Sequence, residues 1–263
     1  MSAAGKILSS IRDSVATLTF NNPERHNAVS LEMWRAAAEP LENFAVDPAV
    51  RLVILTGAGD KAFASGADIS KFDSERGSAD AVATYNSTVE RLQQTLLDYP
   101  KPTLALIRGY CIGGGLSIAL CCDLRIANEK SRFAIPAAKL GLGYSYSSVR
   151  HLMDLVGPQF AYEILFTARQ FDAAEALQMG LVNRVLPDSE IQAYAHQMAE
   201  MIGGNAPLTI QAVKRIVREA LKEESQRDVA ACDLLVQRCF ASADYEEGRR
   251  AFLEKRKPRF LGR

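Results

Sequence analysis

Two glycine-centred loops constrain this chain more than any other feature. Residues 62–72 read AFASGADISKF, and residues 111–127 read CIGGGLSIALCCDLRIA. Each loop follows a strand-like apolar run, Leu52–Thr56 before the first and Thr103–Ile107 before the second. Small residues in such loops let backbone N–H groups face a ligand, and two N–H groups aimed at one oxygen form an oxyanion hole. The loops therefore predict stabilisation of an enolate or a tetrahedral oxyanion at a carbonyl group.

Strands and helices alternate along the first part of the chain. Residues 6–12 and 15–21 predict a hairpin that turns near Asp13-Ser14. Ser30 is a suitable N-cap for a helix from Leu31, which Asp47-Pro48 ends. Such alternation favours a β/α design with crossover connections. The other expected elements are, in order, strand Leu52–Thr56, helix Ala79–Tyr99, strand Thr103–Ile107, a short apolar helix after the second loop, and strand Leu124–Ala127.

The pattern changes after about Gly157. Helical periodicity dominates there, interrupted by one predicted strand at residues 182–186, and the tail from Pro207 is helical and highly charged. We therefore expect a β/α core over residues 1–200 and a helical C-terminal region over residues 201–263.

Composition excludes several classes of function. The 31 basic and 31 acidic residues balance, which argues against a nucleic-acid-binding surface. No run of 18 or more apolar residues predicts a membrane span, and residues 1–10 lack the apolar run of a secretory signal. The histidines are too scattered for a metal site, so no metal or redox cofactor is expected. An odd number of cysteines without C-x-x-C spacing predicts buried thiols in a reducing compartment, the cytoplasm: Cys111, Cys121, Cys122, Cys232 and Cys239.

The two loops, in their order and spacing, resemble the enoyl-CoA hydratase/isomerase (crotonase) superfamily. The resemblance extends through FNNPERHNA at residues 20–28, GPQFAYEILFTARQFDAAEALQMGLVNRV at residues 157–185, and AFLEKRKPRF at residues 251–260. It implies an α/β, crotonase-like spiral of ββα units with a helical C-terminal trimerisation region. It also implies an acyl-CoA thioester as the substrate, coenzyme A only as part of that substrate, and a homotrimer or homohexamer.

The resemblance also implies which residues form the site. The two amides of the oxyanion hole are those of Ala67 and Gly114, where Gly113–Gly115 let the backbone approach the thioester oxygen. Asp68 and Asp123 are interpreted as structural hydrogen-bonding groups in preference to catalytic carboxylates. Phe252 is assigned either to CoA or to core packing. The positions that correspond to CoA contacts are Arg25, Ala28, Ser65, Ala67, Asp68, Ile69, Lys71, Gly113, Gly114, Phe252 and Lys255.

Two positions depart from the family's hydratases. Those enzymes use two glutamates, one as base for water and one as acid for the α-carbon. The first lies two residues after the glycine triplet, where this chain has Ser117, and the second follows a proline, where this chain has Ala137 after Pro136. Alanine moves no proton, and a serine hydroxyl is a poor base without an activating group. Ser117 also lacks the context of a catalytic nucleophile, and a hydrogen bond from its hydroxyl to the helix backbone is expected.

Tyr144 is the most informative residue near these departures. Some decarboxylases of the superfamily that act on malonyl-type CoA esters carry a tyrosine at the matching place, although they also have a histidine where this chain has Ala67. Decarboxylation needs no base, because the departing CO₂ leaves its electron pair behind. The alternative is that Tyr144 lines or supports the acyl pocket. With Ser145, Tyr146 and Ser147 it indicates either a polar distal pocket or an exposed turn.

Three functions follow from these residues. The first is an enzyme that forms an acyl-CoA enolate without paired glutamates, by decarboxylation, isomerisation or modified hydration. The second is a non-catalytic acyl-CoA-binding protein. The third is a hydratase with replacement acid/base groups, such as Asp68 or Tyr144. We adopt the first hypothesis, the enolate-forming enzyme, and we expect catalytic contributions from Ala67, Gly114 and Tyr144.

Overall fold

The computed structural model describes residues 6–263, and these begin with the predicted hairpin. Strands β1 (Lys6–Arg12) and β2 (Val15–Asn21) pair antiparallel. Asp13 and Ser14 join them with φ of 50° and 65°, and positive φ at both central residues is the mark of the type I′ turn that suits a twisted hairpin. Met1–Gly5 lie outside the described residues. They are the first half of the segment at residues 1–10 in which no secretory signal is expected.

Two helices replace the single helix expected after Ser30. The Ser30 side chain accepts a hydrogen bond of 3.3 Å from the backbone of the first turn of α1 (Leu31–Ala36), which confirms the predicted N-cap. Helix α2 (Ala38–Val46) follows and ends before Asp47, as expected. Pro40 explains the interruption, because it has no N–H to bond to the carbonyl four residues earlier and its ring crowds that carbonyl.

The larger sheet has the strand order β1-β2-β3-β5-β7-β10. Every neighbouring pair after β1–β2 is parallel. The added strands are β3 (Leu52–Gly57), β5 (Thr103–Ile107), β7 (Leu124–Asn128) and β10 (Arg184–Leu186). The predicted strands at residues 52–56, 103–107 and 124–127 are confirmed, and β10 is shorter than the strand predicted at residues 182–186.

The smaller sheet shows how the chain winds. Its order is β4-β6-β8-β9, from β4 (Ala62–Ala64), β6 (Tyr110–Ile112), β8 (Arg132–Ala134) and β9 (Phe171–Asp172). Strands β4, β6 and β8 follow β3, β5 and β7 along the chain, so each turn gives one strand to each sheet and then enters a helical segment. The predicted spiral of ββα units is therefore confirmed.

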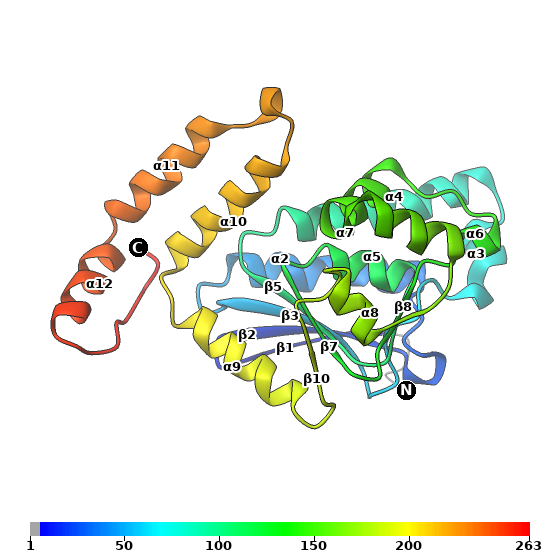
Figure 1. Ribbon diagram of the computed structural model, residues 1–263, viewed down its shortest axis with the longest axis horizontal. Coiled ribbons are helices and arrows are strands. Elements are labelled where there is room, and N and C mark those ends of the chain that lie inside the picture. Colours follow the sequence, from blue (N-terminus) through cyan, green and yellow to red (C-terminus); the bar gives the residue numbers. More distant parts are fainter. Residues whose placement is uncertain (1–5) are drawn as a thin grey trace. The chain divides into compact units, whose positions relative to one another are not determined.

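The helices of the spiral surround α5 (Gly114–Leu120). Both α4 (Ala79–Leu97) and α7 (Tyr146–Thr167) pack against α5, and Figure 1 shows all three on one side of the larger sheet. Helix α7 is kinked at Gly157, which has φ 75° and ψ 166° just before Pro158. Short helical elements complete the spiral: η1 (Pro23–Arg25), η2 (Ile69–Lys71), α3 (Phe72–Arg76), α6 (Ala137–Leu140) and α8 (Ala173–Gln178).

The chain divides into two compact units. The first holds the chain through Tyr99 together with Thr103–Ala195, and the second holds Pro100–Pro102 and His196–Arg263. The boundary lies inside α9 (Ile191–Gly203), the helix that also contains the boundary expected after residue 200. The remaining elements of the second unit are α10 (Pro207–Leu221), η3 (Glu224–Gln226), α11 (Val229–Phe240) and α12 (Ala243–Leu253).

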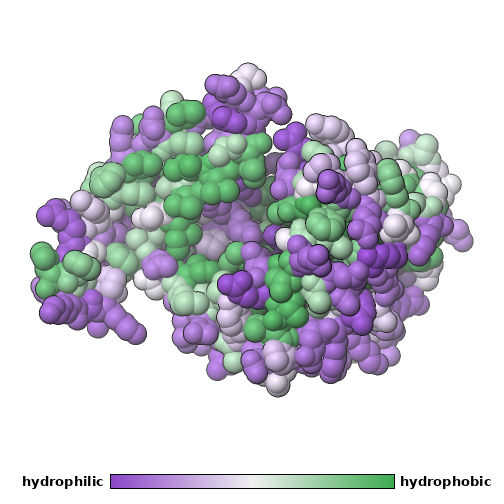
Figure 2. Space-filling view, viewed as in Figure 1, coloured by the Kyte–Doolittle hydropathy of each residue, from purple (hydrophilic) through white to green (hydrophobic). Residues whose placement is uncertain are grey.

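The second unit leaves large apolar side chains exposed. Figure 2 shows hydrophobic residues gathered over α10 and α11. Exposed apolar surface of this extent is typical of protein–protein interfaces, and trimerisation through this region stays a prediction. The exposed residues on these two helices include Val213, Val217, Leu221, Val229, Leu234 and Phe240.

All five cysteines are free thiols. Four are buried as expected, whereas Cys239 on α11 is only half-buried. Over residues 6–263 no helix is long and apolar enough to cross a membrane. The same residues contain no group of three His, Cys, Asp or Glu side chains placed to hold a metal ion.

Candidate active site

The two glycine loops meet at the start of α5. A side chain at Gly66 would place its Cβ 3.1 Å from the Ile112 carbonyl oxygen and 3.6 Å from the Gly114 nitrogen. Gly66 has φ +97°, a conformation that other residues rarely adopt. The glycine is therefore required twice, for its backbone angle and for the close approach of the loops. The structure thus brings Ala67, the next residue along, to the first turn of α5.

The backbone N–H of Ala67 points away from the segment around Val29. It forms an isolated parallel bridge with Val29. The hydrogen bonds of that bridge run from the Val29 N–H to the Gly66 oxygen at 2.8 Å and from the Asp68 N–H to the Val29 oxygen at 3.1 Å. In a parallel bridge the central residue points its own N–H to the other side of the strand. The Ala67 amide therefore faces away from Val29.

Gly114 supplies the second candidate amide. As the first residue of α5 it has an N–H with no acceptor inside the helix. Gly113, its N-cap, has φ 54° and ψ −121°. A Cβ at Gly115 would lie 2.3 Å from the Ala64 carbonyl oxygen, so a side chain there would push the loops apart. Gly113 is therefore favoured by its positive φ and Gly115 by the lack of space for a side chain, whereas a Cβ at Gly114 would lie 3.4 Å from the Trp34 ring.

Ser117 lies one turn into α5 and is tied to Tyr144. The Ser117 Oγ is 3.2 Å from the Gly113 carbonyl oxygen, which confirms the expected bond to the helix backbone. It is also 2.7 Å from the Tyr144 hydroxyl. A carbonyl only accepts, and the serine hydroxyl has one proton. When Ser117 donates to Gly113, Tyr144 must therefore donate to Ser117.

The environment of Tyr144 keeps its phenol protonated. Burial raises the pKa of Tyr144 above its ordinary value of 10.0, and the hydrogen bond between Tyr144 and Ser117 only partly offsets that effect. Desolvation penalises the charged phenolate more than the neutral phenol. At neutral pH the group is therefore a proton donor and not a base.

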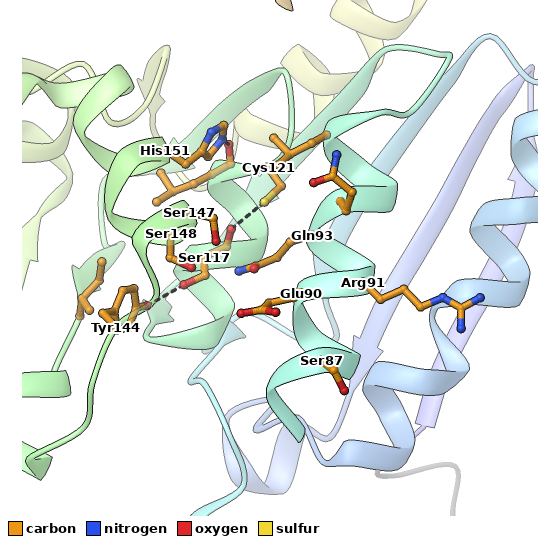
Figure 3. Close-up of a pocket in the computed structure, with 14 residues that line it drawn as sticks. Ser87, Glu90, Arg91, Gln93, Ser117, Cys121, Tyr144, Ser147, Ser148 and His151 are labelled. Atoms are coloured by element: carbon orange, nitrogen blue, oxygen red, sulfur yellow. Dashed lines mark hydrogen bonds between the residues drawn. The ribbon is translucent and has the colours of Figure 1, made fainter. Parts of the chain in front are cut away.

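A cavity of 440 Å³ opens beside this pair, between α4, α5 and α7. Figure 3 shows the Ser117–Tyr144 hydrogen bond at its wall, with Cys121 and His151 further along. Ala67 and Gly114 do not line it. The cavity therefore begins at Ser117, one turn of α5 beyond Gly114. Its lining residues are Ser87, Glu90, Arg91, Gln93, Gln94, Leu97, Ser117, Leu120, Cys121, Ile135, Tyr144, Ser147, Ser148 and His151.

In the serine- and tyrosine-rich turn at residues 144–148, some side chains line the cavity and others do not. Tyr144 and Ser147 line the cavity, as the polar-pocket interpretation requires. Tyr146 does not, because it is 80% exposed. Ser145 acts as the N-cap of α7, and its Oγ accepts from the Ser148 N–H at 3.4 Å. That interpretation is therefore wrong for Tyr146 and Ser145.

Ala137 follows Pro136, which lies beside the glycine triplet. It is the first residue of α6 and is buried. The Gly113 N–H donates to the Ala134 oxygen at 2.8 Å, and the Pro136 ring lies 3.8 Å from the place of a Gly113 Cβ. The position after Pro136 therefore adjoins the hole but carries only a methyl group.

Asp68 is held by neighbours and does not line the cavity. Its carboxylate accepts from the Arg25 Nη1 at 3.1 Å and from the Ser70 N–H and hydroxyl at 3.1 and 2.6 Å. Arg25 also contacts the Ser70 hydroxyl. Burial opposes ionisation, but the hydrogen bonds from Ser70 and Arg25 outweigh it and lower the pKa of Asp68. These contacts favour the structural role over a replacement base.

Asp123 also forms structural contacts. Its carboxylate accepts from the Thr103 N–H at 2.7 Å and from the Thr103 hydroxyl at 3.0 Å. The bonds join the end of α5 to the start of β5, which agrees with the expected hydrogen-bonding role.

Some of the expected CoA contacts lie together around the first loop. Ser65 donates its N–H to the His26 oxygen at 3.1 Å, and the buried Ala28 donates to the Arg25 oxygen at 3.0 Å. Ile69 and Lys71 are exposed on η2. Arg25, Ala28, Ser65, Ala67, Asp68, Ile69 and Lys71 thus form one neighbourhood with the triplet.

The other two expected contacts lie in the second unit. Phe252 is 84% exposed near the end of α12, so it is not part of a core there. Lys255 is exposed and has φ 55°.

The sequence pattern missed the residues that α4 contributes. Glu90 and Gln93 point from α4 toward Ser117 in Figure 3. His151 on α7 has its Nε2 2.8 Å from the Leu120 oxygen, and the Cys121 Sγ donates to the Ser117 oxygen at 3.2 Å. The available signal was the polar stripe of α4, since a polar helix face has a second use when it borders a cavity.

Comparison with known proteins identifies the family. A sequence model of the family described as enoyl-CoA hydratase/isomerase matches residues 10–263. Crotonyl-CoA hydratase of Syntrophomonas wolfei is 32% identical over 251 residues, which cover 95% of this chain and 96% of that protein. The 2,3-dehydroadipyl-CoA hydratase of Escherichia coli is 32% identical, covering 98% of this chain and 99% of that protein.

A solved structure agrees in fold as well as in sequence. The enoyl-CoA hydratase/carnithine racemase of Magnetospirillum magneticum superposes with a TM-score of 0.92 at 36% identity, covering 98% of this chain and 96% of that chain. The similarity thus covers nearly the whole of both chains. The chain therefore belongs to the enoyl-CoA hydratase/isomerase family.

Proposed function

We propose that this protein is an enzyme that stabilises the enolate of an acyl-CoA thioester with the amides of Ala67 and Gly114. The observation that supports the proposal is the close packing of Gly66, the neighbour of Ala67, against Gly113 and Gly114. Two preorganised N–H donors gain strength as negative charge develops on the thioester oxygen. Their combined effect is largest in the transition state, which is what catalysis requires.

Proton transfer in this site differs from that of the family's hydratases. The two glutamate positions hold Ser117 and Ala137, and Asp68 is engaged by Arg25. Neither Ser117 nor Ala137 can remove a proton from water at neutral pH. The proposal therefore gives the hole its usual charge-stabilising role and assigns proton transfer to other groups.

A second candidate function is decarboxylation of a malonyl-type acyl-CoA. The observation that favours it is the Tyr144 hydroxyl at the cavity wall, 2.7 Å from Ser117 and with a raised pKa. The bond between Cα and the carboxylate breaks, CO₂ departs, and the electron pair moves into the enolate held by Ala67 and Gly114. Tyr144 then donates its proton to Cα and regains one from solvent. No base is needed at any step.

The test is turnover of a mixed CoA panel by the purified protein, followed by mass spectrometry. The panel contains crotonyl-CoA, longer 2- and 3-enoyl-CoAs, and malonyl-, methylmalonyl- and ethylmalonyl-CoA. Turnover that is lost in Gly114→Pro supports the enolate enzyme, and loss of CO₂ selects the decarboxylase. An unchanged panel with CoA esters still bound would refute catalysis on these esters and support a non-catalytic acyl-CoA-binding protein.

A further inference from the structure

One face of α4 forms a wall of the cavity. Ser87, Glu90, Gln94 and Leu97 line it, at the three- and four-residue spacing that places side chains on one face of a helix. Tyr85, Leu92 and Leu96 are buried elsewhere on the same helix. Helix α4 therefore packs with its apolar stripe and presents a largely polar stripe to the cavity.

Glu90 is the carboxylate on that wall. Among the lining residues, it is the one acidic side chain. Figure 3 shows its carboxylate pointing from α4 toward Ser117, while the guanidinium of Arg91 points away from the cavity. Within residues 6–263, no hydrogen bond or ion pair engages the Glu90 carboxylate. Asp68, by contrast, is committed to Arg25 and Ser70.

The position of Glu90 matches the place where proton transfer must occur. Ser117 is three residues beyond Gly114 on α5, a rise of about 4.5 Å along the helix axis. The α-carbon of a thioester lies two bonds from the oxygen that the hole would hold. The wall near Ser117 therefore borders the first carbons of a bound acyl chain, and this is the wall toward which Glu90 points.

We propose that Glu90 is the acid/base residue of this site and supplies from α4 the carboxylate that positions 117 and 137 lack. The carboxylate removes a proton from Cα: the C–H bond breaks, its electron pair moves into the enolate, and the thioester oxygen carries the charge against the Ala67 and Gly114 amides. The proton on Glu90 then returns to carbon. Glu90 is exposed in the free protein, and a bound acyl chain would cover it from water.

This inference rests on the proposed enolate, so the test must separate the base from the hole. Exchange of the α-hydrogens of butyryl-CoA for deuterium in D₂O needs both a base and an oxyanion hole, but no leaving group and no added water. Mass spectrometry follows the gain in mass. Binding is read separately from the fluorescence of Trp34, the single tryptophan, whose ring lies 3.4 Å from the place of a Gly114 Cβ.

The variants are Glu90→Gln, Glu90→Asp and, as a matched control, Glu42→Gln. Glu42 is an exposed glutamate on α2 and does not line the cavity. General acid–base groups contribute roughly 10²- to 10⁴-fold, so Glu90→Gln is expected to slow exchange by at least about 100-fold. Its butyryl-CoA binding should stay unchanged. Glu90→Asp should recover part of the rate, and Glu42→Gln all of it.

The outcomes separate the two claims. Exchange at the wild-type rate in Glu90→Gln would overturn the role of Glu90 while leaving the enolate enzyme standing. Wild-type protein that decarboxylates a malonyl-type ester but exchanges no deuterium would also overturn it, again without harm to the proposed function. Wild-type protein that neither exchanges deuterium nor converts any ester of the panel would overturn both. Equal loss of binding and exchange in Glu90→Gln would show a binding role and overturn the catalytic one.

Discussion

The two ends of the candidate site, at Gly114 and around Ser117, use different chemical groups. At the start of α5 the functional groups are backbone amides, positioned by Gly66 and the Gly113–Gly115 triplet through contacts that exclude side chains. One turn further, around Ser117 and Tyr144, the functional groups are side chains. The first end has the glycines that the resemblance to the family implies, and the second has Ser117 and Ala137 where that resemblance implies glutamates.

This difference shows which groups of a site can be substituted while the fold is retained. A backbone amide has no side chain to mutate, and its place depends on the packing of β4, β6 and α5. A catalytic side chain can be replaced without disturbing that packing, since Ser117 and Ala137 are accommodated in buried positions. Under the proposed function, the chemistry of the second end can therefore change while the amides of the first end still stabilise an oxyanion.

The strongest way to test this comparison is to restore the missing carboxylates. The double variant Ser117→Glu/Ala137→Glu should gain hydration of crotonyl-CoA, because the hole would then have an acid and a base beside it. Each such group is worth roughly 10²- to 10⁴-fold, so the gain over wild type should be at least about 100-fold. Mass gain of one water measures it.

The matched control is Ser117→Gln/Ala137→Gln, which has the same shape without the charge. It should show no gain. If the glutamate variant folds, binds a CoA ester and still fails to hydrate crotonyl-CoA, the two ends are not independent and the comparison is wrong.

The next effect tests the backbone end directly. Gly114→Pro removes one N–H at the first position of a helix, where proline is well tolerated. Losing one donor of an oxyanion hole costs about 10²- to 10³-fold in rate. We expect kcat/KM to fall by that amount on whichever CoA ester the protein converts, with little change in Tm.

Gly114→Ala is the control for that substitution, because it retains the N–H. Its Cβ would lie 3.4 Å from the Trp34 ring, a tight contact that the ring can relieve by a small shift. It should therefore keep most of the activity. Equal losses in the two variants would point to steric disruption and not to a missing donor.

The side-chain end is tested by Tyr144→Phe, which removes the hydroxyl and keeps the ring. If Tyr144 protonates the enolate, decarboxylation of a malonyl-type ester should slow by about 100-fold, the lower end of the range for a general acid. Because the pKa of Tyr144 is raised above 10.0, the phenol stays neutral through the physiological range. Activity that depends on it should hold at neutral pH and fall only above about pH 10.

Tyr144→Phe in a hydration or exchange assay tests whether Tyr144 donates a proton or only positions Ser117. A proton donor to the enolate affects decarboxylation, whereas a group that only positions Ser117 would alter KM and leave kcat close to wild type. Unchanged decarboxylation in Tyr144→Phe would remove Tyr144 from the chemistry.

The backbone end was readable in the sequence, and the side-chain end was only partly so. Glycines in two loops after apolar strands indicate a close approach of main chains. The resemblance to the family then pointed to the amides of Ala67 and Gly114. The alternation of strands and helices predicted the β/α design, and the resemblance to the family predicted the spiral, although Pro40 divided one expected helix. Glu90 was not predictable, because a glutamate on a polar helix face looks the same whether it borders solvent or a cavity.

Most features of the site that the sequence did not predict are contacts between residues far apart in the chain. Asp68 was ambiguous until Arg25, 43 residues away, was seen to pair with its carboxylate. Tyr144 and Ser117 are 27 residues apart, and nothing in either segment encodes a bond of 2.7 Å between them. Tyr146 and Ser145 show the opposite failure, since neighbours in a polar turn point to different places.

The smallest expected effect concerns the support of the first loop. Asp68→Asn keeps the shape of the side chain but loses the charge that Arg25 and Ser70 stabilise. Arg25 is half exposed, so screening limits the loss of unfolding free energy to about 1 kcal/mol at neutral pH. The folded pKa lies below the ordinary 3.8, so the stabilisation is present above pH 3.8 and is lost as pH falls through the folded pKa. Urea unfolding at neutral pH and below about pH 3 should therefore show a difference between wild type and variant that shrinks in acid. Asp60→Asn, at an exposed turn, should show no such difference, and an Asp68→Asn effect that is independent of pH would mean that the carboxylate acts through shape and not through its charge.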